Sequence, residues 1–182
     1  MIFFGNCSPN SSLRGPHFHA LARSIVYQQI ATAAATAIYG RVRDLTPTTG
    51  FPTADQVLGL SEEELRGAGL SRSKTRAMRD LAEKTVSGEF GLRSIGRQTD
   101  EEVIRRLTAV WGVGEWTAHM SLIFKLGRLD VMPTGDLAVR EGLKILDGME
   151  KRPRPEMLLE RAEVWRPLRS VASWFLWRLT DN

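Results

Sequence analysis

Short helical stretches, separated by capping residues and glycines, fill almost the whole sequence and constrain the fold more than any other feature. Apolar residues recur at three- and four-residue spacing, whereas clear two-residue alternation and Asn-Gly turns are missing. Hydrophobic residues make up 42% of the 182 positions and charged residues 25%, which is ordinary for a soluble globular protein. We therefore expect an all-α fold of short helices without a sheet.

Capping residues and helix stops predict where these helices begin and end. Ser61 with Glu64, and Thr99 with Glu102, have the spacing of capping boxes. Pro155 suits the first turn of a helix, where its missing N–H is not needed. The expected helices span about 18–43 (one helix or two abutting ones), 53–58, 61–67, 71–88 (starting at Ser71 or Ser73), 99–107, 115–126, 136–146, 155–164 and 167–179.

A glycine-rich turn lies in the segment VWGVGEWTA, residues 110–118. Gly112 and Gly114 flank one apolar residue between two predicted helices, and the small residues Thr117 and Ala118 follow. Glycines let main-chain N–H groups approach a phosphate closely. On its own, such a pair of glycines more often marks a plain helix–helix turn. Together with the aspartate of PTGDLAVREG further on, however, the pattern indicates a helix-hairpin-helix that binds phosphate through its amides.

Asp136 is the aspartate of that segment and heads the predicted helix through Leu146. As a helix N-cap it stabilises the helix and needs no other role. A carboxylate in this position also tends to stay ionised, because the helix dipole and the free N–H groups favour the anion. Such an anion can stabilise a reaction that passes through a cationic sugar. Both roles are compatible.

Composition limits the classes of protein to which this chain can belong. The single cysteine, Cys7, rules out a disulfide framework or a four-cysteine cluster within the chain. No apolar run is long enough to span a membrane, and the N-terminus lacks the pattern of a secretion signal, so we expect a cytoplasmic protein (nucleoid-associated in a bacterium). The net charge of +4 favours polyanions, although only weakly.

Four segments together resemble the helix-hairpin-helix/Gly-Pro-Asp superfamily of DNA glycosylases, and most closely its AlkA-like 3-methyladenine DNA glycosylases. These segments are FHALARSIVYQQIATAA (18–34), LTAVWGVGEWTAHMSLIF (107–124), DVMPTGDLAVREGL (130–143) and WRPLRSVASWFLW (165–177). The resemblance implies two helical lobes with the active-site cleft between them. The central lobe would cover about 31–126, with the hairpin at 107–118, and the other lobe about 18–30 and 127–182. Residues 1–17 are expected to be irregular.

The resemblance also implies site residues. Asp136 matches the catalytic carboxylate of the family. Relatives that also cut the DNA strand carry a lysine where this chain has Trp116, and an indole cannot form a Schiff base. We therefore expect a monofunctional enzyme that uses water and leaves an abasic site. The residues expected to line the base pocket are Trp116, Met120, Trp177, Tyr27 and Phe18.

Further roles follow from the same resemblance. Gln29, or its neighbour Gln28, is expected to fill the gap left by the flipped nucleotide, although two adjacent glutamines are otherwise ordinary surface residues. The residues expected at DNA phosphates are Gly112, Gly114, Glu115, Thr117, Thr134 and Gly135. The backbone carbonyls expected to hold a Na⁺ or K⁺ ion are those of Thr108, Val110 and Val113. No other cofactor is expected, and the lack of a cysteine cluster excludes the iron–sulfur branch.

Two features of the sequence depart from the resemblance or lie outside it. Tyr27 replaces the small residue usual in relatives, and only about 17 unpatterned residues precede Phe18, where relatives usually have a helix and a linker. A run of basic residues at Arg72, Lys74, Arg76 and Arg79 is most simply a solvated helix face, but it could also follow a DNA backbone.

The expected function is that of a monomeric base excision repair enzyme on double-stranded DNA with a damaged base. It would flip an alkylated purine, 3-methyladenine or 7-methylguanine, and hydrolyse its N-glycosidic bond. Such purines are cationic, and an electron-rich indole attracts them. One alternative is a glycosylase for deaminated or oxidised bases. Another is a non-catalytic helix-hairpin-helix module that only binds DNA, against which the presence of Asp136 argues.

Overall fold

The computed structural model describes residues 17–47, 50–89 and 95–181. All regular structure in these ranges is helical, which confirms the predicted all-α class. The segment expected to be irregular, except for His17, lies outside the described residues, as does Cys7. None of the described helices has the length and apolar character needed to cross a bilayer.

Contacts divide the chain into two compact units, one ending at Gly114 and the other beginning at Glu115. We call them the N-terminal and the C-terminal unit. They are bounded differently from the expected lobes, which placed residues 18–30 with the C-terminal half and the boundary near residue 126. The first helix packs on two helices of the N-terminal unit, and its apolar face is buried there.

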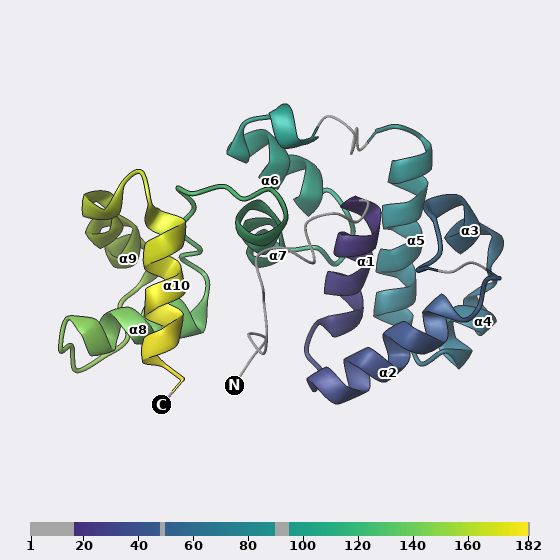
Figure 1. Cartoon of the computed structure of the whole chain (residues 1–182), viewed down its shortest axis with the longest axis horizontal. Helices are drawn as coiled ribbons and strands as arrows, with labels where there is room; N and C mark the ends of the chain where they lie inside the picture. Colours follow the sequence, from purple (N-terminus) through teal and green to yellow (C-terminus); the bar gives the residue numbers. More distant parts are fainter. Residues whose placement is uncertain (1–16, 48–49, 90–94, 182) are drawn as a thin grey trace. The chain divides into compact units, whose positions relative to one another are not determined.

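Helix α5 lies at the centre of the N-terminal unit (Figure 1). It contacts α1, α3 and α4, while α1 also contacts α2. Leu21 and Ile25 of α1 and Met78 and Leu81 of α5 are buried, so the amphipathic faces of these helices form the core. The elements of this unit are α1 (His17–Tyr27), α2 (Thr32–Arg43), α3 (Ala54–Gly59), α4 (Glu62–Gly67), α5 (Arg72–Val86), the 3₁₀ turn η1 (Ile95–Arg97) and α6 (Asp100–Thr108).

Side-chain caps start most of these helices, largely as predicted. The capping box of Ser61 and Glu64 is present at α4, and Ser71 rather than Ser73 caps α5. At α6 the predicted box is only half right. Thr99 accepts from the N–H of Glu102, but the Glu102 carboxylate binds Arg105 and Arg106 instead of returning to the cap. Two guanidinium partners outcompete one main-chain N–H for the same carboxylate.

The C-terminal unit is built on the contact between α8 and α10, which Figure 1 shows crossing each other. Gly142 makes the close approach possible, because a Cβ there would lie 2.1 Å from the carbonyl oxygen of Leu176. The elements are α7 (Glu115–Met120), the π-helical turn η2 (Ser121–Lys125), α8 (Leu137–Leu146), α9 (Pro155–Arg161), the 3₁₀ turn η3 (Ala162–Trp165) and α10 (Arg169–Leu179).

Three boundaries in this unit differ from expectation. The predicted helix 115–126 is α-helical only to Met120 and then widens into the π-helical turn, and the helix expected over 155–164 turns 3₁₀ after Arg161. The last helix begins at Arg169 rather than Pro167, after a cis peptide bond between Arg166 and Pro167. Pro155 does occupy the first turn of α9, as predicted.

The start of α10 is fixed to the loop before α8. The Arg169 guanidinium donates to the carboxylate of Asp130, with 2.7 Å between Nε and Oδ1. The Ser170 hydroxyl donates to the carbonyl of Arg128 and accepts from the N–H of Val131. These bonds set where α10 lies within its unit, and with it the side chains that α10 contributes to the site.

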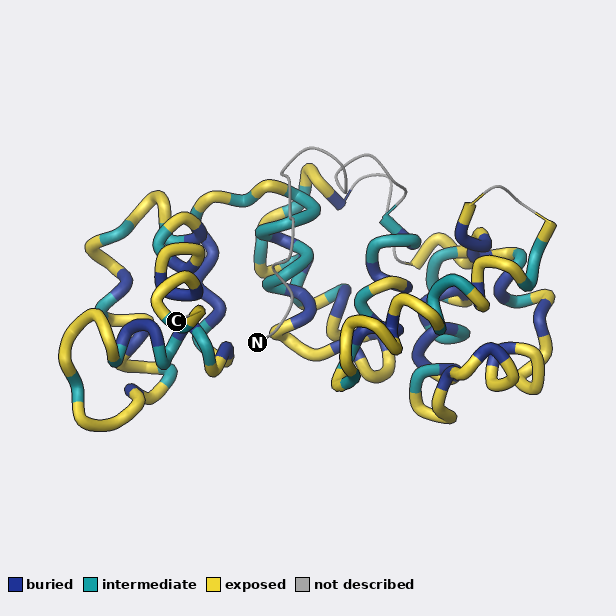
Figure 2. The backbone as a smooth tube through the Cα atoms, turned by 60° about the horizontal axis from the view of Figure 1, so that its bottom comes forward, coloured by how far each residue is buried: buried dark blue, intermediate teal, exposed yellow. Residues whose placement is uncertain are grey.

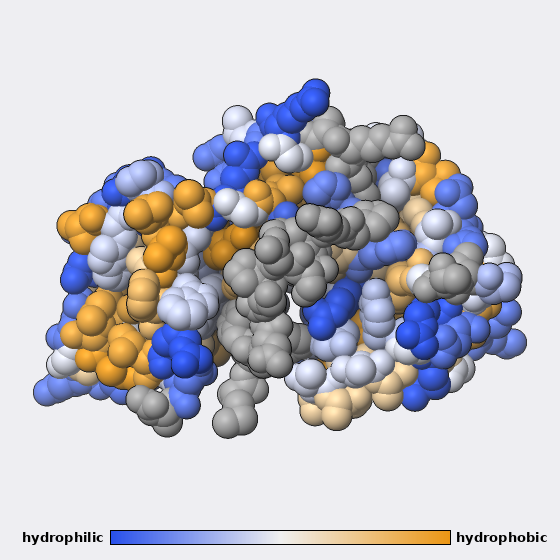
Figure 3. Space-filling view, viewed as in Figure 1, coloured by the Kyte–Doolittle hydropathy of each residue, from blue (hydrophilic) through white to orange (hydrophobic). Residues whose placement is uncertain are grey.

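Buried and exposed positions alternate along the helices of each unit, as Figure 2 shows. Apolar side chains also reach the surface of the C-terminal unit. Val164 is 73% exposed and Phe175 59% exposed, and apolar residues gather over α8 to α10 on the side drawn in Figure 3. Among the helices of this unit, α8 and α10 share the most extensive contact.

Candidate active site and phosphate-binding hairpin

Asp136 is the N-cap of α8 and is almost completely buried, with 7% of its surface exposed. Its Oδ1 atom accepts from the N–H groups of Ala138 and Val139, each at 2.9 Å. The turn before it is closed by a bond from the Asp136 N–H to the carbonyl of Pro133. The capping role considered from the sequence is therefore real, and it fixes the carboxyl group rigidly.

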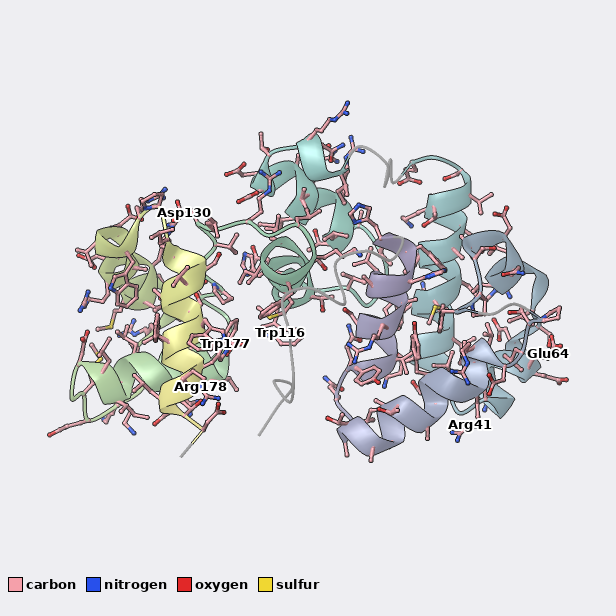
Figure 4. All side chains as sticks on the ribbon, viewed as in Figure 1. Arg41, Glu64, Trp116, Asp130, Trp177 and Arg178 are labelled. Carbon is pink, nitrogen blue, oxygen red and sulfur yellow. The ribbon has the colours of Figure 1, made fainter. Side chains whose placement is uncertain are left out.

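Two tryptophans also donate to this carboxylate. The indole N–H of Trp177, on α10, reaches Oδ1 at 3.2 Å, and that of Trp116, on α7, reaches Oδ2 at 2.6 Å. Figure 4 labels both side chains. Four donors thus stabilise the anion. Three of them are on Oδ1 and one on Oδ2, so Oδ2 keeps more capacity to accept a further hydrogen bond.

The two indoles differ in exposure. Trp116 is 41% exposed and is therefore accessible to a ligand, whereas Trp177 is 5% exposed. The ring of Phe124 stacks on Trp177, with centroids 5.8 Å apart and 28° between the ring planes. Sequence reasoning missed Phe124. Its four-residue steps from Trp116 through Met120 were a signal, but the π-helical turn makes such spacing unreliable there.

Met120 ends α7 and is half-buried. Thr134 is half-buried in the turn before Asp136, while Gly135 is exposed. Glu115 is exposed at the start of α7. Thr117 is buried, which favours the packing role of this small residue over the predicted phosphate contact. The ligand contacts of the other residues stay predictions.

The hairpin between α6 and α7 is a tight turn. The N–H of Val113 donates to the carbonyl of Val110 at 3.0 Å, and Gly112 has a φ of +76°, a conformation that favours glycine. Gly112 and Gly114 are exposed. The main-chain N–H of Trp111 is already used, because it donates to Oδ2 of Asp80 on α5 at 2.7 Å.

A hollow of about 720 Å³ lies against this hairpin. All three residues whose carbonyls were predicted to hold a monovalent cation line it, which is compatible with such an ion, although two cationic side chains of α5 share the same hollow. Its lining residues are Arg76, Asp80, Lys84 and Thr108 to Gly114. The hollow belongs entirely to the N-terminal unit.

The two adjacent glutamines directly follow α1 and lie in different surroundings. Gln28 is half-buried, and its amide donates to the carbonyl of Gly112 at 3.2 Å, so it links α1 to the hairpin. Gln29 is exposed and has a φ of +54°, which is unusual for a residue other than glycine. Backbone strain of this kind often marks a functional residue. The geometry therefore favours Gln29 over Gln28 as the residue that can reach a ligand.

Tyr27 and Phe18 lie in the core of the N-terminal unit. The Tyr27 hydroxyl is 3.0 Å from the hydroxyl of Thr36 on α2, and the Arg23 guanidinium lies 4.2 Å from the centre of its ring. Packing and these contacts explain both aromatic residues without a ligand. Their predicted place in a base pocket stays a prediction.

Comparison with known proteins identifies the family. The family model described as "HhH-GPD superfamily base excision DNA repair protein" matches residues 22–167, which is most of the chain. The chain therefore belongs to the HhH-GPD superfamily. This confirms the family and the fold predicted from the hairpin and Asp136.

Individual relatives agree with this assignment. DNA-3-methyladenine glycosylase 1 of Schizosaccharomyces pombe is 36% identical over 176 residues, covering 96% of this chain and 77% of the relative. The solved structure of S. pombe 3-methyladenine DNA glycosylase (Mag1) in complex with abasic DNA has a TM-score of 0.80, with 36% identity over 96% of this chain and 85% of that one. A DNA-3-methyladenine glycosidase from Bacillus halodurans has a TM-score of 0.82, with 37% identity over 88% and 74% of the two chains.

Proposed function

We propose that this protein is a monofunctional DNA glycosylase of base excision repair that hydrolyses the N-glycosidic bond of alkylated purines in double-stranded DNA. The observation that carries the proposal is the Asp136 carboxylate, held by two main-chain and two indole N–H groups in a chain of the HhH-GPD superfamily. The names of its relatives, DNA-3-methyladenine glycosylases, support the choice of substrate.

The reaction needs a fixed negative charge. Alkylation at N3 or N7 gives the purine a positive charge, so the base leaves as a neutral molecule when the bond to C1′ breaks and takes the bonding electrons with it. The sugar is then an oxocarbenium ion, which the Asp136 anion stabilises. Water adds to C1′, and Oδ2, which has the remaining capacity to accept a hydrogen bond, orients this water and takes up the proton that it loses, before passing it to solvent.

Trp116 serves two purposes in this proposal. Its N–H holds Oδ2 of Asp136, and its exposed ring face attracts a cationic purine more strongly than a neutral one. Because an indole is not a nucleophilic amine, no Schiff base with the sugar forms, and the product is an intact strand with an abasic site.

DNA binding would use the N-terminal unit and the hairpin. The exposed amides of Gly112 and Gly114 suit a phosphate, and Gln29 would fill the gap left by the flipped nucleotide. A Na⁺ or K⁺ ion held by the carbonyls of Thr108, Val110 and Val113 would add positive charge beside that phosphate. We propose that the protein acts as a monomer.

A panel of defined lesions tests the proposal. The purified protein should release 3-methyladenine and 7-methylguanine from alkylated duplex DNA, and strand breaks should appear only after alkali has cleaved the abasic sites. Release of hypoxanthine, uracil or an oxidised purine instead would favour the alternative glycosylase. Strand cleavage without alkali would contradict the monofunctional mechanism. DNA binding without release of any base would leave only a binding module.

A further inference from the structure

Helix α5 lines the hollow at the hairpin with three charged side chains, and their contacts give each a different role. Arg76, Asp80 and Lys84 follow one another at four-residue spacing, so they lie on one face of the helix. Opposite them the hollow is bounded by main chain and side chains of the hairpin, from Thr108 to Gly114. Of the three, only Arg76 was considered from the sequence, as part of the basic run that could follow a DNA backbone.

Asp80 and Lys84 serve the structure of the hairpin. The Asp80 carboxylate binds Lys84 Nζ through Oδ1 at 2.5 Å and the Trp111 N–H through Oδ2 at 2.7 Å. Burial alone would raise the pKa of Asp80, but these two hydrogen bonds and the charges of Lys84 and Arg76 more than offset it, and the pKa lies below its ordinary value. Asp80 is therefore an anion that fixes the hairpin to α5, and Lys84 neutralises it.

Two other basic residues of α5 are also used within the fold. Lys74 donates to the carbonyl of Val26 at 2.6 Å, and Arg79 donates to the carbonyl of Leu60 at 2.8 Å. The basic run seen in the sequence is thus not a uniform surface for a polyanion. Unlike Lys74 and Arg79, Arg76 lines the hollow.

Arg76 is held in place without being neutralised. Its guanidinium carbon lies 4.4 Å from the centre of the Trp111 ring, and no carboxylate in the described part of the chain pairs with it within 4.0 Å. Stacking on an aromatic ring occupies the face of a guanidinium but leaves its N–H donors, which point outward in the plane, available for a phosphate. The main chain of Trp111 is itself fixed, because its N–H donates to Asp80.

We propose that Arg76 binds a phosphodiester of the DNA backbone beside the one expected at the hairpin amides, with Trp111 as the platform that orients it. The net charge of the hollow suits an anionic phosphate. The charges of Asp80 and Lys84 cancel, so Arg76 leaves one net positive charge there. Such a contact adds affinity for any duplex and reads no sequence. The inference rests on the proposed function only in that DNA is the ligand.

The test is the salt dependence of binding to an undamaged duplex, which requires no base excision. Each neutralised phosphate contributes about 0.9 to the slope of log K against log salt concentration. For Arg76→Gln we expect weaker binding to every duplex sequence and a slope smaller by about one. The matched control is Arg66→Gln, which removes the same charge from an exposed position on α4, away from the hairpin in Figure 1, and should leave the slope unchanged.

A second variant separates charge from geometry. Arg76→Lys keeps the charge but loses the planar stack on Trp111, so we expect the wild-type slope with reduced affinity. A slope for Arg76→Gln equal to that of the wild type, or equal losses in Arg76→Gln and Arg66→Gln, would overturn the proposal. If the slope falls as expected but no lesion is excised, the phosphate site stands and the proposed catalytic function fails.

Discussion

The carboxylate of Asp136 receives more hydrogen bonds than capping a helix requires. Two main-chain N–H groups satisfy the cap, and the indoles of Trp116 and Trp177 add two further donors from other elements. Both tryptophans were expected only as ring faces for a base. In the structure each also acts through its N–H, so one residue type provides packing area and orients the proposed catalytic anion.

Replacing Trp177 by phenylalanine tests this second role. The variant keeps an aromatic ring that can stack on Phe124 but loses the N–H donor to Oδ1. A hydrogen bond to a charged group contributes about 1.5–3 kcal/mol, so we expect the rate of base release in a single turnover to fall about tenfold or more. Trp174→Phe, at an exposed position on the same helix, should change the rate little. Equal rates for Trp177→Phe and the wild type would contradict the positioning role.

At the scale of elements, the contact between α8 and α10 holds the site together. Asp136 caps α8, and Trp177 belongs to α10, so their hydrogen bond depends on how closely the two helices approach. Gly142 sets that approach. No side chain could replace its hydrogen without moving the main chain of Leu176.

We therefore expect Gly142→Ala to destabilise the protein by about 3 kcal/mol and to lower activity with it, since overpacking a close contact forces the helices apart. Unfolding in denaturant measures the change. Gly40→Ala is the matched control, because Gly40 also lies within a helix but has open space around it. That substitution should be neutral or stabilise the protein by up to about 1 kcal/mol. Similar stability of the two variants would contradict the proposed packing.

The link between the hairpin and α5 predicts a pH dependence. The pKa of Asp80 is lower in the folded protein than its ordinary value of 3.8. The ionised form therefore contributes stability above that pH, and the contribution is lost as the pH falls through the lowered value. We expect Asp80→Asn to reduce the free energy of unfolding by about 1 kcal/mol at neutral pH. The difference from the wild type should shrink as the pH falls below 3.8, and a difference that stays constant would contradict the role of the anion.

At the scale of the whole molecule, local signals in the sequence were the reliable ones. The capping box at Ser61, Pro155 in the first turn of α9, and Asp136 at the head of α8 depend on residues a few positions apart, and the structure confirms them. The second half of the box at Thr99 was wrong, because arginines on the next turn of α6 bind Glu102.

The contacts that join distant parts of the chain could not be predicted in this way. Trp177 donates to Asp136 across 41 residues, and Trp111 donates to Asp80 across 31. No periodicity encodes such pairs, since they depend on how the helices of a unit pack. The same reason hid Phe124, which reaches Trp177 from a π-helical turn that periodicity reads as ordinary α-helix.

The decisive measurement compares Asp136→Asn with the wild type on duplex DNA containing an alkylated purine. Asparagine is as good a helix cap as aspartate, so the variant should fold and bind DNA while it loses the negative charge. We expect base release in a single turnover to fall more than about a hundredfold. Asp147→Asn, at the other end of α8, should release the base at the wild-type rate. Wild-type base release by a folded Asp136→Asn variant would contradict catalysis by this carboxylate.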